Sequence, residues 1–398
     1  MKVAWYSNAP SPTGYGVQTE SITTRMKADG HEVDVLANYG QQVGVGDRDG
    51  IRVWPQGAVQ YSLDVVKDQC DIIKPDIVFV LYDVWVLKGA FGDYRVMAWS
   101  PVDHYPPPPQ VLSWARENEV IAMSEFGARA FREMGVEPFD TIWHGVEKVY
   151  HPSPSDIRES MKVPADAYLI GMANANIGTT PVRKNWGGNL EAVARLMHAH
   201  DDVYLYLHTD LRHPNGMPID VLINALGIPQ DRVRMVPPVM YKGSLIVAEE
   251  LARIYSACDV MVAATKGEGF GLVPLEAMAC GTPAIVSDFS AQPEVVGDTG
   301  WKIPGQLDWD HNQGSWFFTP FTAFIAKALE EAYAERGTEA AQRRREACIE
   351  HAKQFDAQTL YETKWRPLLA RIADSQKERP GKTNAAKRRA KKAKKAAA

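Results

Sequence analysis

The feature that most constrains the fold of this chain is an alternation of short apolar runs with helical patterns, which occurs twice along the sequence. In the first half, apolar runs rich in β-branched and aromatic residues lie at 3–6, 33–37, 77–81, 96–99, 120–123 and 141–143. Strands that alternate with helices form βαβ units, whose strands lie parallel in a sheet. This half therefore predicts a doubly wound α/β domain, with residues 16–29 as its first helix.

A turn-rich stretch, His-Pro-Ser-Pro-Ser at residues 151–155, interrupts the pattern. The alternation then restarts, with strands expected at 168–172, 203–208, 233–236, 260–263, 284–287 and 301–303, and helices at 189–198 and 245–256. A chain of 398 residues is also longer than one hydrophobic core usually organises. We expect two Rossmann-like domains, at residues 1–152 and 165–356.

The C-terminal part is helical and then strongly basic. Helices are expected at 322–336, 339–355 and 357–373, and Lys/Ala-rich sequence of low complexity follows. Between Lys382 and Lys395 there are eight basic residues and no acidic ones. The net charge of −5 is therefore the sum of +8 in this segment and about −13 in the rest of the chain. We expect a C-terminal helix at 357–374 and a disordered tail at 375–398, a candidate contact for a polyanion such as nucleic acid or an anionic membrane.

Composition excludes several other classes of protein. Hydrophobic residues make up 45% and charged residues 23%, as in soluble globular domains. No apolar stretch approaches the roughly 18 residues of a membrane-spanning helix, and the N-terminal run is too short for a signal peptide. The four cysteines form no C-x-x-C pair. A cytoplasmic protein with reduced thiols is expected, which could still lie at the periphery of a membrane or on nucleic acid.

The most informative motif lies at residues 268–283 and reads Glu-Gly-Phe-Gly-Leu-Val-Pro-Leu-Glu-Ala-Met-Ala-Cys-Gly-Thr-Pro. It follows the strand expected at 260–263, and its proline and final glycine suit the first turn and the end of a helix. Gly269 and Gly271 allow backbone N–H groups to approach a ligand, and a helix N-terminus favours a diphosphate. Glu268 and Glu276 can face that ligand from different sides and accept hydrogen bonds from sugar or ribose hydroxyls.

This motif resembles the E-x7-E signature of retaining GT-B glycosyltransferases, specifically the family 4 group that includes bacterial mannosyl- and glucosyltransferases. The resemblance implies that Glu268 holds hydroxyls of the donor sugar and that Glu276 holds the nucleotide ribose. The donor-binding loop comprises Gly269, Phe270, Gly271 and Leu272. The implied architecture is the GT-B fold: two Rossmann-like domains face each other across a cleft, and the C-terminal helix returns to the first domain.

The same resemblance implies a reaction. A hexose-type sugar passes from a nucleotide-diphosphate sugar, the donor, to an acceptor with retention of configuration and without a metal or other cofactor. In such enzymes retention is ascribed to front-face attack, in which a donor phosphate oxygen helps remove the acceptor proton, so no protein nucleophile is expected. The sequence shows no Asp/His cluster with metal-ligand spacing. The acceptor stays open among lipid, glycan, protein and nucleic acid.

Cations must stabilise the diphosphate that leaves in such a transfer. Arg183 and Lys184 follow the first strand of the second domain and resemble the family's Arg/Lys clamp, although Ala175 stands where many members carry arginine. Asp103 and His104 follow the strand expected at 96–99 and resemble a polar site of the first domain beside the reacting sugar. The turn at residues 143–147, Trp-His-Gly-Val-Glu, resembles the family's H-G-V-D turn and is expected to shape the cleft.

Two alternatives remain open. Gly14 and Gly16 form a G-x-G-x-x-T pattern after the first strand, which fits donor phosphate in the glycosyltransferase interpretation and also resembles a weak dinucleotide fingerprint. An NAD-dependent Rossmann oxidoreductase is therefore one alternative. Against it, the glycines do not directly follow the strand, and no acid ends the second strand. A nucleotide-sugar epimerase of the GT-B fold is the other alternative, which the E-x7-E match disfavours.

Overall fold

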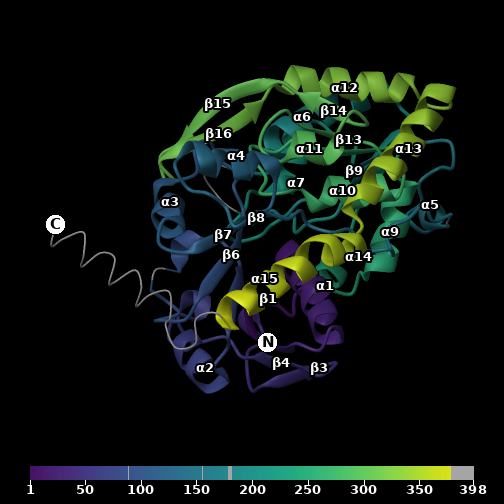
Figure 1. Cartoon of the computed structure of the whole chain (residues 1–398). Helices are drawn as coiled ribbons and strands as arrows, with labels where there is room; N and C mark the ends of the chain where they lie inside the picture. Colours follow the sequence, from purple (N-terminus) through teal and green to yellow (C-terminus); the bar gives the residue numbers. More distant parts are fainter. Residues whose placement is uncertain (88, 155, 178–181, 378–398) are drawn as a thin grey trace. The chain divides into compact units, whose positions relative to one another are not determined.

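The computed structural model describes residues 1–87, 89–154, 156–177 and 182–377, and these residues form two units. Unit 1 comprises Met1–Val102, Pro107–Gly145 and the described residues from Ala357 onward; unit 2 comprises Asp103–Pro106 and Val146–Asp356. Figure 1 shows their elements. The predicted basic tail from residue 378 and the first residues of the clamp motif, Thr180 and Pro181, lie outside the described residues.

The sheet of unit 1 has eight strands in the described part of the chain, in the order β3-β4-β2-β1-β5-β6-β7-β8. Its strands pair in parallel, except for the antiparallel pair β3–β4. The strands are β1 (Lys2–Ala9), β2 (Glu32–Gly40), β3 (Gly46–Arg48), β4 (Ile51–Trp54), β5 (Ile77–Leu81), β6 (Val96–Ser100), β7 (Glu119–Ala122) and β8 (Asp140–Thr141). Every residue of β5 and β6 is buried, as expected for central parallel strands.

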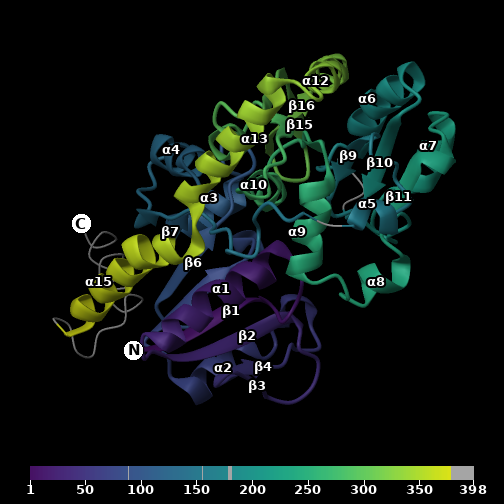
Figure 2. The ribbon, with the colours of Figure 1, turned by 90° about the vertical axis from the view of Figure 1, so that its right-hand side faces the viewer.

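Helices cover the faces of this sheet, and Figure 2 shows the first of them lying along β1 and β2. The helices of unit 1 are α1 (Gly14–Ala28), α2 (Val66–Ile73), α3 (Pro109–Ala115), α4 (Glu125–Glu133), α14 (Ala357–Leu360) and α15 (Arg366–Lys377). Short 3-10 turns lie at Gln60–Ser62 and Val84–Val86, and a π-helical turn at Tyr361–Trp365 joins α14 to α15.

The last helices pack on the core of unit 1 through one large aromatic residue. Trp365 is fully buried, with its ring centroid 5.5 Å from that of Trp5 and 4.9 Å from that of Trp99. Asp29, which follows α1, forms an ion pair with Arg366 at 2.7 Å. These contacts hold the segment that begins at Ala357 against the first-half sheet, more than 200 residues away in sequence. Helix α15 continues to Lys377, past the expected start of the tail at residue 375.

Unit 2 contains a second sheet, with six parallel strands among the described residues in the order β11-β10-β9-β12-β13-β14. Renumbered from β9, this is the 3-2-1-4-5-6 order of the Rossmann fold, in which ligands bind outside the carboxyl ends of the strands. The strands are β9 (Tyr168–Met172), β10 (Val203–Leu207), β11 (Val233–Met235), β12 (Val260–Ala263), β13 (Ala284–Ser287) and β14 (Trp301–Ile303). The prediction of two doubly wound α/β domains is therefore confirmed.

The helices of unit 2 enclose an apolar core that includes Trp186, Leu190 and Leu205. They are α5 (Ile157–Ser160), α6 (Trp186–Ala199), α7 (Ile219–Ala225), α8 (Pro238–Lys242), α9 (Ala248–Ala257), α10 (Leu272–Ala279), α11 (Gln292–Val296), α12 (Thr322–Ala334) and α13 (Glu339–Ala352). Short 3-10 turns lie at Gln230–Arg232 and Lys353–Phe355. The four cysteines are buried and unpaired.

Unit 2 also contains a hairpin that was not predicted. Strands β15 (Gly305–Asp310) and β16 (Ser315–Pro320) form an antiparallel hairpin outside the six-stranded sheet. In Figure 1 the hairpin lies beside α12. Its aromatic residues, Trp309, Trp316, Phe317 and Phe318, and its turn sequence, His-Asn-Gln-Gly, are typical of a hairpin, but a pattern of alternating strands and helices does not predict it.

Candidate functional site

The site is built on a sharp turn between the buried strand β12 and helix α10 in unit 2. The backbone of the turn lies against Asp103, because a Cβ added at Gly267 would come within 2.1 Å of the Asp103 carbonyl oxygen. Gly271 begins the helix with φ +119°, a conformation that side chains other than hydrogen strongly disfavour. The N–H groups of the first helical turn have no acceptor within the helix and point toward the loop.

Three predicted site residues meet at this turn. Lys184 Nζ lies 2.6 Å from Glu268 Oε1, and Arg183 Nη1 lies 2.8 Å from Glu268 Oε2. Arg183 Nη1 also donates to the Gly267 carbonyl at 2.7 Å, and its own carbonyl accepts from Lys266 N at 2.7 Å. We call Arg183, Lys184 and Glu268 the clamp. The structure thus brings together two cations and a carboxylate that are 84 residues or more apart in sequence.

Electrostatics fixes the charge of the clamp carboxylate. Burial favours the neutral acid and would raise the pKa of Glu268, but the charges of Arg183 and Lys184 outweigh it and lower the pKa to about 2. Burial and the neighbouring Arg183 lower the pKa of Lys184, while Glu268 acts in the opposite direction. Glu268 is therefore a permanent acceptor at neutral pH.

The Asp103–His104 pair lies beside the clamp, also within unit 2. Asp103 Oδ2 is 3.8 Å from Arg183 Nε, and Asp103 Oδ1 is 2.7 Å from His104 Nδ1. Burial would raise the pKa of Asp103, but His104 and Arg183 lower it to about 2. His104 is itself buried, so this pair is a fixed part of the site wall.

The hairpin β15–β16 supplies two site residues that were not predicted. Asp310 Oδ2 lies 3.4 Å from His104 Nε2, and the Phe317 ring stacks on the imidazole with centroids 3.6 Å apart. Tyr105 N donates to the Trp316 carbonyl at 3.0 Å, which fastens the two segments together. More than 200 residues separate these partners, so no local pattern could have found them.

Glu276 occupies a different environment. It lies on α10 and is buried, and Tyr255 Oη donates to its Oε2 at 3.3 Å. Burial raises the pKa of Glu276 to about 8, although hydrogen bonds from Tyr255 and Tyr150 act against this rise. Near neutral pH the pKa values therefore favour the ionised form of Glu268 and the neutral form of Glu276.

The loop residues divide into backbone and core roles. Gly269, Gly271 and Leu272 are half-buried, whereas Phe270 is buried and packs edge-on against Phe355 with centroids 5.8 Å apart. Only the backbone of Phe270 is available to a ligand in this arrangement. Ser290 Oγ accepts from Glu268 N at 2.9 Å and holds the start of the loop.

Two buried polar groups follow the same strands and lack partners among the described residues. They are Asn174 Nδ2, after β9, and Thr265 Oγ1, after β12. A buried polar group without a partner costs about 1–3 kcal/mol. Such groups at the carboxyl ends of parallel strands are consistent with a polar ligand at this edge of the sheet.

Gly14 and Gly16 lie in unit 1, in the first turn of α1. Gly16 N donates to the N-cap Thr13 Oγ1 at 3.2 Å, and a Cβ at Gly16 would clash with the Ser11 carbonyl, which accounts for this glycine without a ligand. Strand β1 ends at Ala9 and β2 ends without a terminal carboxylate, so the two departures from the dinucleotide fingerprint hold in the structure. Nothing there favours the oxidoreductase.

The predicted turn residue His144 also belongs to unit 1. Its ring is buried 4.4 Å from that of Trp99, and burial lowers its pKa to about 3. Within the described ranges, no set of three or more His, Cys, Asp or Glu side chains is arranged to hold a metal ion. No helix in the described part of the chain has the length and apolar character needed to cross a membrane.

Part of the chain matches known proteins in sequence. Residues 176–310, which contain the clamp and α10, match the family described as Glycosyl transferases group 1. Over 132 residues the chain is 41% identical to the MMP alpha-(1->4)-mannosyltransferase of Mycolicibacterium hassiacum, covering 33% of this chain and 28% of that protein. Over 192 residues it is 27% identical to the GDP-mannose-dependent alpha-(1-6)-phosphatidylinositol dimannoside mannosyltransferase of Mycobacterium tuberculosis, covering 46% and 44%.

These matched segments span less than half the length of either mannosyltransferase. The fold comparison covers nearly the whole chain. Sucrose-phosphate synthase from Thermosynechococcus elongatus superposes with a TM-score of 0.70 at 19% identity, over 93% of this chain and 99% of that one. The chain therefore has the GT-B fold, with two Rossmann-like units.

Proposed function

We propose that this chain is a glycosyltransferase that moves a hexose-type sugar from a nucleotide-diphosphate sugar to an acceptor, with retention of configuration and without a metal. The observation that carries the proposal is the clamp: two cations held on one half-buried carboxylate, beside a glycine turn that opens a helix. Anion binding at a helix N-terminus and charge stabilisation by fixed cations are the two requirements for departure of a diphosphate.

The parts of the site take distinct roles in this proposal. Glu268, ionised because of its low pKa, accepts hydrogen bonds from hydroxyls of the donor sugar. Arg183 and Lys184, whose head groups the carboxylate holds in place, stabilise the leaving diphosphate together with N–H groups of the loop 269–272. Because these groups are preorganised, they need no rearrangement during the reaction.

Bond changes then follow the front-face route that the E-x7-E resemblance implies. The bond from the anomeric carbon to the donor phosphate oxygen breaks, and a bond from that carbon to the acceptor oxygen forms on the same face. The acceptor proton passes to a phosphate oxygen of the leaving nucleoside diphosphate. Asp103 and His104 form the wall beside the reacting sugar, and the protein supplies no nucleophile.

Glu276 is proposed to hold the ribose of the donor. Its carboxyl group is buried beside Tyr255, in surroundings that favour a neutral acid, and two ribose hydroxyls would stabilise the ionised form. Donor binding should therefore release a proton from Glu276 near neutral pH. The mannosyl and GDP-mannose names of the relatives make GDP-mannose the first donor to test. UDP-glucose is the second, because a protein of similar fold has a title that names UDP-2-fluoro glucose.

The test is a donor panel scored by thermal stabilisation and by hydrolysis of the nucleotide sugar. We expect at least one nucleotide-diphosphate sugar to raise the melting temperature and to be hydrolysed slowly in excess chelator. Arg183→Gln should remove both effects. Arg195→Gln is the matched control, because Arg195 is an exposed arginine of the same unit paired with Glu191 on α6.

Three outcomes would contradict the proposal. Stabilisation by a nicotinamide cofactor and by no nucleotide sugar would favour the oxidoreductase. Release of an epimerised nucleotide sugar without hydrolysis or transfer would favour the epimerase. Activity that disappears in chelator and returns with Mg²⁺ or Mn²⁺ would contradict the metal-free mechanism.

A further inference from the structure

A cavity lies within unit 2, at the edge of its sheet opposite the clamp. Its volume is about 560 Å³, which is in the range of small-molecule sites. It is lined by residues at the amino ends of four parallel strands: Tyr168 begins β9, Asp259 precedes β12, Pro283 precedes β13 and Trp301 begins β14. A five-residue strand spans about 16 Å, so this cavity and the clamp are separate sites.

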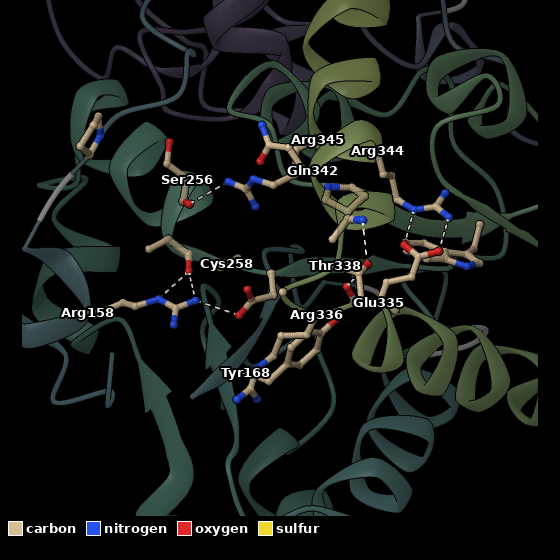
Figure 3. Close-up of a pocket in the computed structure, with 18 of the residues that line it drawn as sticks. Arg158, Tyr168, Ser256, Cys258, Glu335, Arg336, Thr338, Gln342, Arg344 and Arg345 are labelled. Atoms are coloured by element: carbon tan, nitrogen blue, oxygen red, sulfur yellow. Dashed lines mark hydrogen bonds and ion pairs between the residues drawn. The ribbon is translucent and has the colours of Figure 1, made fainter. Parts of the chain in front are cut away.

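Arginines dominate the charged lining (Figure 3). Among the described residues, Arg158, Arg336, Arg344 and Arg345 line the cavity, against the carboxylates Asp259 and Glu335. We call this cavity the arginine pocket. Asp202, outside the lining, pairs with Arg336, so one guanidinium group, that of Arg345, remains in excess. A guanidinium in excess favours an anionic ligand, and its planar shape matches phosphate geometry.

The arginines differ in how many donors the protein already uses. Arg158 makes five hydrogen bonds, to the carbonyls of Ala165, Ala167 and Ala257 and to Asp259, so its role is structural. Arg344 binds Glu335 through two nitrogens at 2.7 and 2.8 Å, and its third nitrogen donates to the Thr299 carbonyl at 3.2 Å, so all three of its nitrogens are engaged. Arg345 makes one long hydrogen bond, at 3.4 Å to the Ser256 carbonyl, and its remaining donors have no other partner among the described residues.

A second observation points independently to a ligand. Tyr168 lines the pocket, and its buried hydroxyl has no hydrogen-bond partner in the part of the chain that the structure describes. Its ring is held edge-on by Tyr333 with centroids 5.2 Å apart, so the hydroxyl cannot swing away to solvent. A buried hydroxyl without a hydrogen-bond partner lowers the stability of the folded protein unless a ligand in the pocket forms that hydrogen bond.

Helix α13 adds a third contribution to the same cavity. Its N-cap Thr338 and two residues of its first turn, Ala341 and Gln342, belong to the lining. Figure 3 shows Arg345 and Gln342 reaching from this helix toward Ser256. The N-terminus of a 14-residue helix carries partial positive charge, so it favours an anion in this cavity.

We propose that the arginine pocket binds a small phosphorylated molecule that also carries hydroxyl groups, the chemistry of a sugar phosphate. Arg345 and the first turn of α13 bind the phosphate. The Tyr168 hydroxyl and the remaining lone pairs of Glu335 bind the hydroxyls. This site is independent of the proposed transferase site, because it lies at the opposite edge of the sheet.

Calorimetry with inorganic phosphate, glucose and the 6-phosphates of glucose, mannose and fructose tests this proposal on the full-length protein. We expect at least one hexose phosphate to bind more tightly than inorganic phosphate, and glucose not to bind. Arg345→Gln should weaken that binding at least about tenfold, since it removes a charge-assisted hydrogen bond. Arg343→Gln, which changes a neighbouring arginine of α13 that pairs with Glu339 outside the pocket, should leave affinity within about twofold.

Tyr168→Phe separates a ligand contact from a structural role. Removing an unpartnered hydroxyl should leave the melting temperature unchanged or higher, yet weaken hexose-phosphate binding by about two- to tenfold. Lys184→Gln in the clamp should not change this affinity. Absence of binding by every hexose phosphate at millimolar concentration, or equal affinity in the Arg345 and Arg343 variants, would overturn the proposal. So would loss of binding in Lys184→Gln, because it would place the phosphate at the clamp.

Discussion

The two edges of the sheet in unit 2 use the same residue types for different purposes. At the carboxyl edge, Arg183 and Lys184 share one carboxylate, Glu268, on a turn that only glycines allow. At the amino edge, Arg158 donates five hydrogen bonds to three carbonyls and one carboxylate, and these bonds connect the starts of β9 and β12. The role of an arginine therefore depends on how many of its hydrogen-bond donors other protein groups leave unused.

The largest functional effect is expected at the carboxyl edge, where the clamp lies. Removal of Arg183 or Lys184 should lower turnover of the identified donor about 100-fold, equivalent to about 3 kcal/mol, as for the loss of one preorganised oxyanion donor. Glu268→Ala should chiefly lower turnover, and Glu276→Ala should chiefly weaken donor binding. Steady-state kinetics checks this. Less than a threefold loss in both Arg183→Gln and Lys184→Gln would show that the clamp is not part of the reaction.

At the amino edge the arginine that is fully engaged should instead control stability. Arg158→Met leaves the Ala165, Ala167 and Ala257 carbonyls and the half-buried Asp259 without their partner, and should cost about 3 kcal/mol of unfolding free energy. Urea unfolding measures it. Arg195→Met on the exposed face of α6 is the control and should cost less than about 0.5 kcal/mol. Equal losses of unfolding free energy in the two variants would contradict the structural role assigned to Arg158.

Glu268 and Glu276 allow a test of opposite sign. Folding raises the pKa of Glu276 from about 4.5 to about 8, so the folded state binds the extra proton and stability falls as pH rises through that window. Between about pH 7 and about pH 9, wild type should lose about 1 kcal/mol relative to Glu276→Gln. Thermal unfolding across a pH series measures this difference.

Glu268→Gln provides the counterpart. The pKa of Glu268 falls from about 4.5 to about 2 on folding, so its ionised form stabilises the protein above about pH 4.5, and this stabilisation is lost as pH falls toward 2. Glu268→Gln should therefore be less stable than wild type at neutral pH, with the difference vanishing in acid. The same dependence in both glutamine variants would contradict the two environments described for the motif.

The sequence predicted the sheets well, because buried parallel strands are continuous apolar runs. Residues 168–172, 260–263 and 284–287 were predicted with the bounds observed. Strand β1 was predicted too short, because polar Ser7 and Asn8 end the apolar run while the parallel pairing with β2 continues to Ala9. Hydrogen bonds that side chains do not reveal extend the strand.

The site was predictable only where a motif carries it. Glu268, Arg183 and Lys184 were expected as site residues from local patterns, whereas Asp310 and Phe317 reach His104 from a hairpin that the sequence did not predict. The arginine pocket could not be predicted either, because its residues come from segments far apart in the sequence. Its lining combines residues at the starts of four strands with residues of α13. The sequence around Tyr168 does not indicate that its hydroxyl lacks a hydrogen-bond partner among the described residues.

The smallest effect on either edge should come from the basic tail, which we propose to be an electrostatic tether. Deletion of residues 381–398 removes eight positive charges and no residue of the clamp or of the arginine pocket. Donor turnover, hexose-phosphate affinity and melting temperature should therefore stay within error of the full-length values. Binding to DNA, RNA or anionic vesicles should fall, and the binding by full-length protein should weaken steeply with salt because it depends on released counterions. Equal low-salt binding by both forms would reject the tether, and a change at either edge would show that the tail acts on the enzyme body itself.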